Sequence, residues 1–206
     1  MRKPVRILSL MLVVSILGCC ACSKKKSSKV THENLIRAVK NQGAEEQDSI
    51  DVIMSMQREG SIYAICEEDA QEQYDQFVNV FTGFPRVKVE KVTVFIDSDW
   101  TDESNFFAIA LTAKKEKQAK EFFENRDEAI SESADEYDSG EVDGYTYAIA
   151  YQNGDRAEMS GLYLKDDTIV FVRCLSESDD GIDKAAKFYK DLGLIKINRS
   201  HCKNNK

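Results

Sequence analysis

The chain has 206 residues, of which 42% are apolar and 31% are charged, so it is long enough and apolar enough to bury a core. This composition excludes an intrinsically disordered chain and a collagen-like repeat. Only two prolines and ten glycines are present, which argues against a long flexible linker between independent domains.

The first residues of the chain have the pattern of a secretory signal. Basic residues at Arg2, Lys3 and Arg6 precede a mostly apolar run over 7–17. A helix needs about 20 apolar residues to cross the hydrocarbon core of a bilayer, so this run is too short to span one. The pattern predicts export of the chain.

The end of this run carries a more specific motif. Ile16, Leu17 and Gly18 stand directly before Cys19, and this order resembles the lipobox of bacterial lipoproteins. The resemblance implies cleavage after Gly18 and a diacylglyceryl group on the sulfur of Cys19. Two acyl chains suffice for stable anchoring, since burial contributes about 0.8 kcal/mol per methylene. Cys20 fits the motif less well, because Cys19 stands where a small residue is preferred; the alternative is an ordinary signal peptide cut elsewhere in 18–23.

The signal, the tether, the body and the tail differ in charge. Residues 1–18 form the expected signal peptide, and 19–29 form the lipid-anchored Cys and a Lys/Ser-rich tether whose lysines lie near the membrane surface. The body over 30–198 has 18 basic and 36 acidic residues, whereas the tail over 199–206 is basic and polar. So acidic a body is repelled by phosphate backbones, which excludes nucleic acid as a partner. Its charge would attract cations or a basic partner, or would simply keep the domain soluble and off the membrane.

Three strand-then-helix units recur along the body. Apolar β-forming runs over 62–66, 106–111 and 169–175 are each followed by apolar residues at helical spacing, over 70–81, 119–130 and 182–192. An earlier helix is expected over 33–42, where Gly43 follows its C-terminal end. The segment 48–56 fits either a helix or a strand.

Further strands complete the expected sheet. The alternation over 87–96 predicts one, and two more over 145–151 and 158–165 flank a hairpin loop that contains Asn153 and Gly154. With the strand that starts at Thr168 they form an antiparallel meander. We therefore predict a single α+β domain over 30–198, a mostly antiparallel sheet with three or four amphipathic helices on one face, with repeated ferredoxin-like β-α units as a possible origin.

Two acidic segments are candidate cation sites. The segment 97–103 begins like a calcium loop, with oxygen-bearing side chains at its first, third and fifth positions, but Asp102 and Ala108 occupy the places where an EF-hand requires Gly and Glu. An irregular cation site would use Asp97, Asp99, Asp102 and Glu103. The other interpretation is a solvated loop, and the same two interpretations apply to the second acidic loop over 135–144. No resident metal or other cofactor is predicted.

Catalytic motifs are missing from the sequence. There is no Gly-x-Ser-x-Gly elbow, and the only two histidines, His32 and His201, lie near the ends of the body. A hydrolase that uses two carboxylates remains a third hypothesis, although 36 acidic residues make a suitable pair common by chance. We therefore expect a protein without enzymatic activity.

Two cysteines and three tyrosines are the remaining candidate residues. Cys66 and Cys174 lie at strand ends, where they form either a disulfide in an oxidising exterior or two buried thiols. Tyr145, Tyr147 and Tyr151 share one face of their strand, either as an exposed binding row or as rings packed under helices.

The predicted location of the protein and its composition together indicate a class of function. The leading hypothesis is a lipid-anchored extracytoplasmic module without catalytic activity, held at the cell membrane by its diacylglyceryl group, that binds another envelope or extracellular protein. The alternative is a lipoprotein that binds a divalent cation or a small ligand.

Overall fold

The computed structural model describes residues 29–55, 60–79, 83–99, 104–153, 157–176 and 179–195. Within them the chain folds into one sheet of eight strands, in the order β1-β2-β3-β4-β8-β7-β6-β5. Neighbouring strands are antiparallel except β1 and β2, which are parallel. The strands are β1 (Glu45–Gln47), β2 (Gly60–Cys66), β3 (Val89–Asp99), β4 (Ser104–Ala113), β5 (Glu136–Val142), β6 (Tyr145–Gln152), β7 (Ala157–Lys165) and β8 (Thr168–Ser176).

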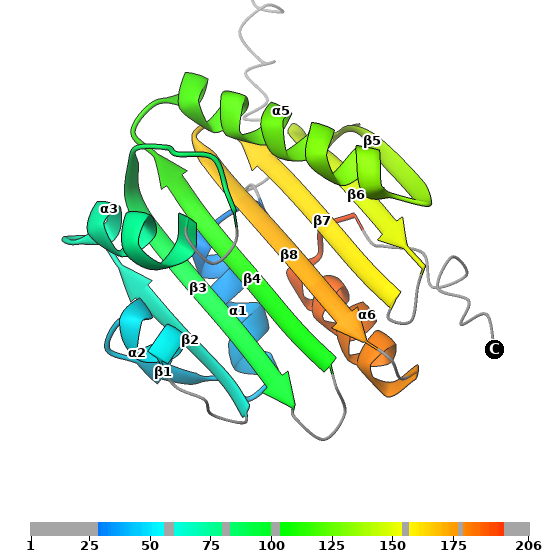
Figure 1. The fold of residues 1–206 in the computed structure, drawn as a ribbon, viewed down its shortest axis with the longest axis horizontal. Helices are drawn as coiled ribbons and strands as arrows, with labels where there is room; N and C mark the ends of the chain where they lie inside the picture. The colour runs from blue at the N-terminus through cyan, green and yellow to red at the C-terminus, as the bar shows by residue number, and fades with distance from the viewer. Residues whose placement is uncertain are drawn as a thin grey trace, which may run out of the picture.

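Helices cover both faces of this sheet. They are α1 (His32–Asn41), α2 (Ile50–Ser55), α3 (Ala70–Gln73) with the π-helix η1 (Tyr74–Val78), α5 (Glu116–Ser133) and α6 (Asp179–Leu192). Figure 1 shows α2, α3 and α5 in front of the sheet and α1 and α6 behind it. The α+β class and the mostly antiparallel sheet are confirmed, and 48–56 contains the helix α2.

The expectation that the helices lie on one face was wrong. Val170, Phe171 and Val172 are consecutive in β8 and are all at most 1% exposed. A strand that buries consecutive side chains has apolar groups on both sides, so each face of the sheet requires its own cover. The sequence run over 169–175 is apolar throughout rather than alternating, which is the pattern of such a strand.

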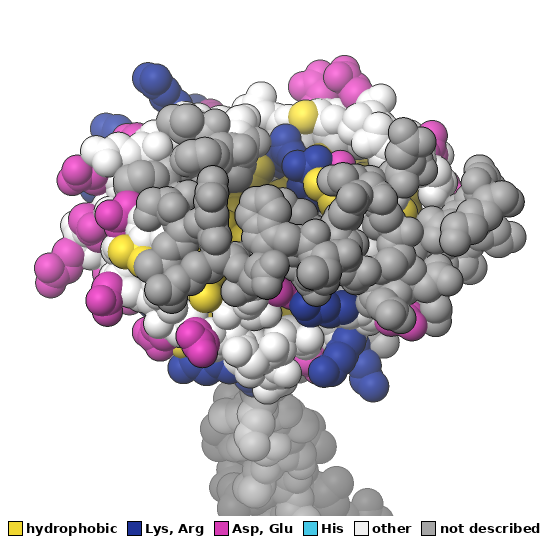
Figure 2. Space-filling view, turned by 60° about the horizontal axis from the view of Figure 1, so that its bottom comes forward, with side chains coloured by type: hydrophobic (Ala, Val, Ile, Leu, Met, Phe, Trp, Pro, Cys, Tyr) yellow, Lys and Arg dark blue, Asp and Glu magenta, His cyan; other side chains and the backbone are white. Residues whose placement is uncertain are grey.

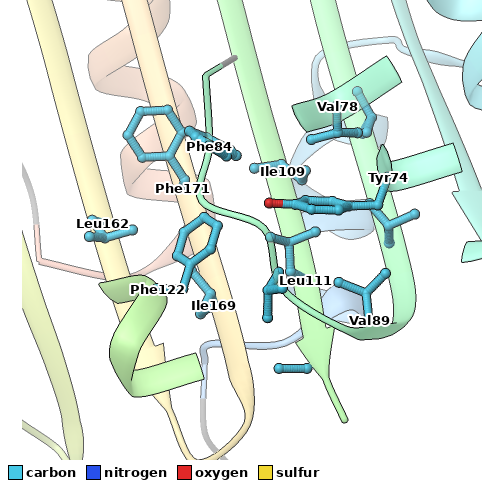
Figure 3. Close-up of a cluster of buried hydrophobic side chains, with 14 of the residues drawn as sticks. Tyr74, Val78, Phe84, Val89, Ile109, Leu111, Phe122, Leu162, Ile169 and Phe171 are labelled. Atoms are coloured by element: carbon cyan, nitrogen blue, oxygen red, sulfur yellow. The ribbon is translucent and has the colours of Figure 1, made fainter. Parts of the chain in front are cut away.

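Two separate cores follow from this arrangement. The front core packs α2, α3, η1 and α5 against side chains such as Val94, Ile109 and Phe171. The back core packs α1 and α6 against side chains such as Phe95 and Val170. Figure 3 shows part of the front core, where Phe84, Phe122 and Phe171 converge.

The chain path does not follow ferredoxin-like β-α-β units. The helices α3 and η1 connect β2 to β3, which are adjacent and antiparallel. The helix α5 instead carries the chain from β4, in the middle of the sheet, to the edge strand β5. The meander β5-β6-β7-β8 then returns to pair β8 with β4.

The second acidic segment is a strand and not a loop. Most of 135–144 belongs to β5, which pairs with β6 from Glu136 opposite Tyr151 to Val142 opposite Tyr145. Asp143 and Gly144 both have positive φ, at 49° and 75°. Asp-Gly with this geometry is typical of a tight two-residue hairpin turn, which fixes the register of both strands. The acidic side chains lie on an exposed edge strand, where charge opposes edge-to-edge aggregation.

The N-terminal end of the described body is attached to the C-terminal end of α6. The Lys29 ammonium donates to the carbonyl oxygen of Gly193 at 2.8 Å. The Asn34 side-chain amide donates to the carbonyl oxygens of Lys29 and Leu192, both at 2.7 Å. The chain therefore enters the body on the back face of the sheet, beside the place where α6 ends.

A glycine in β7 makes room for two buried tyrosines. A methyl group added at Gly161 would lie 2.7 Å from the Tyr163 hydroxyl and 3.0 Å from the Tyr189 ring. Both rings are at most 1% exposed, so neither can move aside easily. We expect Gly161→Ala to lower the free energy of unfolding by about 1 to 3 kcal/mol, measured by urea denaturation.

Gly140 in β5 provides the matched control. The three atoms nearest to a methyl group there all belong to Tyr147, at 3.1 to 3.3 Å, and this side chain is half-buried. Gly140→Ala should therefore cost less than Gly161→Ala. Equal losses for the two variants would contradict the proposed crowding.

Candidate functional site

The front face of the sheet is closely covered at one end and open at the other. Along β4, Leu111 and Ile109 are fully buried, whereas Phe107 is half-buried. Exposure also rises along β8, the neighbour of β4 in the sheet: Phe171 is 1% exposed, whereas the Arg173 side chain is 42% exposed. Figure 1 shows α5 crossing the closed end of this face, so the described helices leave the other end open.

Five side chains on this open end form what we call the arginine platform: Ile96, Phe107, Arg126, Glu158 and Arg173. Phe107 pairs with both Ile96 and Arg173 across the strands, while Arg126 comes from α5 and Glu158 from β7. Figure 2 shows basic and hydrophobic side chains next to one another at this end of the molecule. The platform therefore combines an apolar floor with charged groups.

Arg173 and Glu158 form a two-pronged ion pair. Nε of Arg173 donates to Oε1 of Glu158 and Nη2 donates to Oε2, both at 2.7 Å. Ser160 also donates its hydroxyl to Oε1 at 3.3 Å. Parallel donation of this kind is the strongest carboxylate–guanidinium geometry, so the charge of Glu158 is matched by Arg173.

Arg126 lies beside this pair and has a different environment. Its guanidinium carbon stands 5.2 Å from the ring centre of Phe84 and 5.1 Å from that of Phe171. Its Nε is buried, and among the described residues it finds no hydrogen-bond acceptor. Burial and the neighbouring positive charge of Arg173 lower the pKa of the Arg126 guanidinium, and the carboxylate of Glu158, which is already bound to Arg173, opposes this shift only in part. A half-buried cation beside two aromatic rings and a second guanidinium is costly unless a further anion joins it.

The loop over 83–88 holds the aromatic wall of the platform in place. The Tyr74 hydroxyl donates to the carbonyl oxygen of Pro85 at 2.6 Å, and burial raises the pKa of that hydroxyl. The Gln71 side chain donates to the carbonyl oxygen of Val87 at 3.2 Å and accepts from the amide of Val89 at 2.9 Å. These bonds fix Phe84 against Phe122 and Phe171, with ring centres 5.3 and 5.1 Å apart.

A shallow open pocket of about 200 Å³ adjoins Glu158 between the last turn of α5 and strands β6 and β7. Its polar lining is formed by Ser133, Gln152, Glu158 and Ser160. That volume includes open solvent, and the part of it that can hold a water-sized molecule is about 10 Å³, far below the range of about 300 to 1,000 Å³ that is usual for small-molecule sites. The pocket is therefore a recess at the border of the platform.

The expected cation segment is only partly described. Asp97 is 5% exposed, and its carboxylate forms an ion pair with Lys184 of α6, on the back face. Asp102 and Glu103 lie outside the described residues, and of Asp99 only the backbone is described. Among the residues that the structure places, no group of three or more His, Cys, Asp or Glu side chains could hold a metal ion.

Cys66 and Cys174 do not form a disulfide with each other. Both are buried, but Cys66 belongs to the front core and Cys174 to the back core. The sheet stands between the two sulfurs, so they match the alternative of two buried thiols. Burial raises the pKa of the Cys66 thiol, which makes it a poor nucleophile.

The three tyrosines of β6 do not form an exposed row. Tyr145 and Tyr151 are 6% and 4% exposed in the back core, and Tyr147 is half-buried against the same core. The small residues Ala148 and Ala150 pack on the opposite side, in the front core. The Tyr145 hydroxyl accepts from the amide of Ile195 at 3.1 Å, so it fixes the chain just after α6.

His32 is a structural residue at the start of α1. Its ring nitrogens lie 2.8 Å from the Thr93 hydroxyl and 3.0 Å from the Thr112 hydroxyl. Burial and the positive charge of Lys91 lower the pKa of His32 to about 4. A neutral imidazole held by two hydroxyls has no free nitrogen for catalysis. His201 and Cys19 lie outside the described residues.

Sequence reasoning missed the arginine platform, although a signal for it exists. Arg126 stands four residues after Phe122 and four before Ile130, so helical spacing places it on the apolar face of α5. Arg173 is the only charged residue in the apolar run over 169–175. A charged residue at an otherwise apolar position is informative, because charged side chains are rarely buried unless they are paired.

No family model matches the chain, and no curated protein matches it significantly. Among solved structures, the extracellular domain of PknH from Mycobacterium tuberculosis is similar at a TM-score of 0.38 and 11% sequence identity. The match covers 72% of this chain and 93% of that domain. Within the described part of the chain, no helix combines the length and apolarity needed to cross a membrane.

Proposed function

We propose that this protein is a lipid-anchored extracytoplasmic module that binds another envelope or extracellular protein and has no catalytic activity. The observation that carries the binding role is the arginine platform, a mixed apolar and cationic surface on the open end of the front face. Aromatic residues and arginine are the side chains enriched where proteins meet.

The position of the platform suits an anchored protein. The chain enters the body at Lys29, and His32 contacts Thr112 at the closed end of β4. Phe107 and its partner Arg173 lie five residues further along β4 and β8, roughly 17 Å away at the usual rise of a strand. An anchor at Cys19 would therefore be joined to the body nearer the closed end of the sheet than the platform.

Three residues that could have served catalysis or cation binding have other roles in the fold. His32 is neutral and held between two threonine hydroxyls. Cys66 is buried with a raised pKa, and Asp97 is paired with Lys184. These contacts count against nucleophilic catalysis through His32 or Cys66 and against a cation site that uses Asp97.

The anchor is tested by replacing the modified cysteine. We expect Cys19→Ala to abolish incorporation of radiolabelled palmitate and to prevent cleavage after Gly18, because the sulfur that carries the lipid is gone. The readouts are labelling, membrane fractionation and the mass of the purified chain. Cys20→Ala is the matched control and should be lipidated and anchored like the wild type. Equal labelling of the wild type and Cys19→Ala would overturn the proposed anchor.

A further inference from the structure

We propose that Arg126 receives a single carboxylate from a partner protein, and that the apolar side chains next to this carboxylate pack on the arginine platform. This inference rests on the proposed function and names the chemistry that the platform would recognise.

The charge balance of the platform favours a monoanion. Arg173 and Glu158 neutralise each other through two hydrogen bonds of 2.7 Å. Arg126 has no ion pair with any residue that the structure describes, and its contacts are with two aromatic rings. Among the residues that the structure places, one positive charge is thus left without a counterpart. A carboxylate would match it, whereas a phosphate dianion would add an excess negative charge to a body that is already acidic.

The orientation of Arg126 leaves one side of its guanidinium accessible. Its Nε is buried, but its two Nη atoms are not among the buried atoms that lack a partner. These Nη atoms can therefore donate to a carboxylate from solvent. The rings of Phe84 and Phe171 limit the movement of the group, so little side-chain entropy is lost when an anion binds.

The open shape of the platform favours a protein partner over a small molecule. The adjoining pocket opens to solvent and has only about 10 Å³ of space for a water-sized molecule, so it cannot enclose a ligand of ordinary size. Ile96, Phe107 and Leu175 are half-buried around Arg173 and provide apolar contact area. A carboxylate among apolar side chains of a partner matches both features.

Removal of Arg126 should separate binding from stability. Methionine can pack against the two rings and carries no charge, so Arg126→Met relieves an unmatched, half-buried cation. We expect the Tm of this variant to be equal to that of the wild type or higher. A residue with a purely structural role would instead lower the Tm when replaced.

The binding experiment uses the full chain purified in detergent and ligand-observed saturation-transfer NMR. N-acetylphenylalanine, with an aromatic ring and one carboxylate, should bind with a Kd of about 1 mM, as expected for a ligand of this size. Its amide and the Arg126→Met variant should each weaken binding at least tenfold. Lys187→Gln removes an exposed charge from α6, on the other side of the sheet, and should bind like the wild type.

Each other result overturns the inference in a specific way. Equal binding of the acid and its amide, or unchanged binding by Arg126→Met, would remove Arg126 from recognition. Tenfold tighter binding of phenyl phosphate would contradict the monoanion, and tenfold tighter binding of decanoate would indicate a free apolar acid instead of a partner protein. If a chain that is still anchored through Cys19 binds none of these ligands, this site is refuted, but the proposed location at the membrane is not affected.

Discussion

Replacing Phe84 by alanine should lower the free energy of unfolding by about 3 to 5 kcal/mol, although Phe84 lies in a loop. The ring is 3% exposed and packs edge-on against Phe107, Phe122 and Phe171. Its loss leaves a cavity where β4, β8 and α5 meet. For a domain of this size the loss corresponds to a fall in Tm of about 10 °C, measured by differential scanning calorimetry.

Two further variants keep this prediction specific. Phe84→Leu retains most of the apolar volume and should cost clearly less than the alanine variant. Tyr137→Ala removes an aromatic ring that is 40% exposed on β5, so its effect should be small. A loss below about 1 kcal/mol for Phe84→Ala would mean that the loop over 83–88 only rests on the core.

Acidification should destabilise the fold through His32. The pKa of His32 is about 4 in the folded protein, below its value of 6.5 when unfolded. Between these values the unfolded chain binds more protons than the folded one, so stability falls as the pH decreases from 6.5 toward 4. The imidazole should account for a loss of about 2 to 3 kcal/mol between pH 7.5 and pH 4.5.

The measurement is urea denaturation at several pH values, because carboxylates also titrate in this range. Glu33 and Glu67 oppose the lowered pKa of His32, whereas Lys91 and burial cause it. The difference between the wild type and His32→Gln isolates the imidazole. His201→Gln is the matched control, since it removes the only other histidine. If His32→Gln and the wild type lose the same stability on acidification, the imidazole does not carry the effect.

Local patterns predicted most elements but not their order in the sheet. Helical spacing after each apolar run located α3, α5 and α6, alternation located β3, and the Asn-Gly hairpin signal located β6 and β7. The segment that became β5 was missed because its charges resemble a solvated loop, while the turn at Asp143 and Gly144 carried the signal for a hairpin. The pairing of β4 with β8 depends on α5 crossing the sheet. Such long-range contacts leave no local pattern in a single sequence.

The candidate site was predicted less well, for a related reason. Arg126, Glu158 and Arg173 come from three elements that are distant in the sequence, so only the fold brings them together. The acidic segment over 97–103 was the more visible candidate for a cation site, because its oxygen-bearing residues are contiguous in the sequence. In the fold, however, Asp97 is directed to Lys184 on the back face. Contiguous motifs are easy to see in a sequence, and sites assembled across strands are not.

The attachment of Lys29 and Asn34 to the end of α6 determines how the molecule would respond to mechanical force. Tension applied through the N-terminal segment first loads the hydrogen bonds to Leu192 and Gly193. These bonds join the two ends of the described chain to each other. The helices α1 and α6 would therefore bear the pull together, and the strands would be loaded only after that connection had broken.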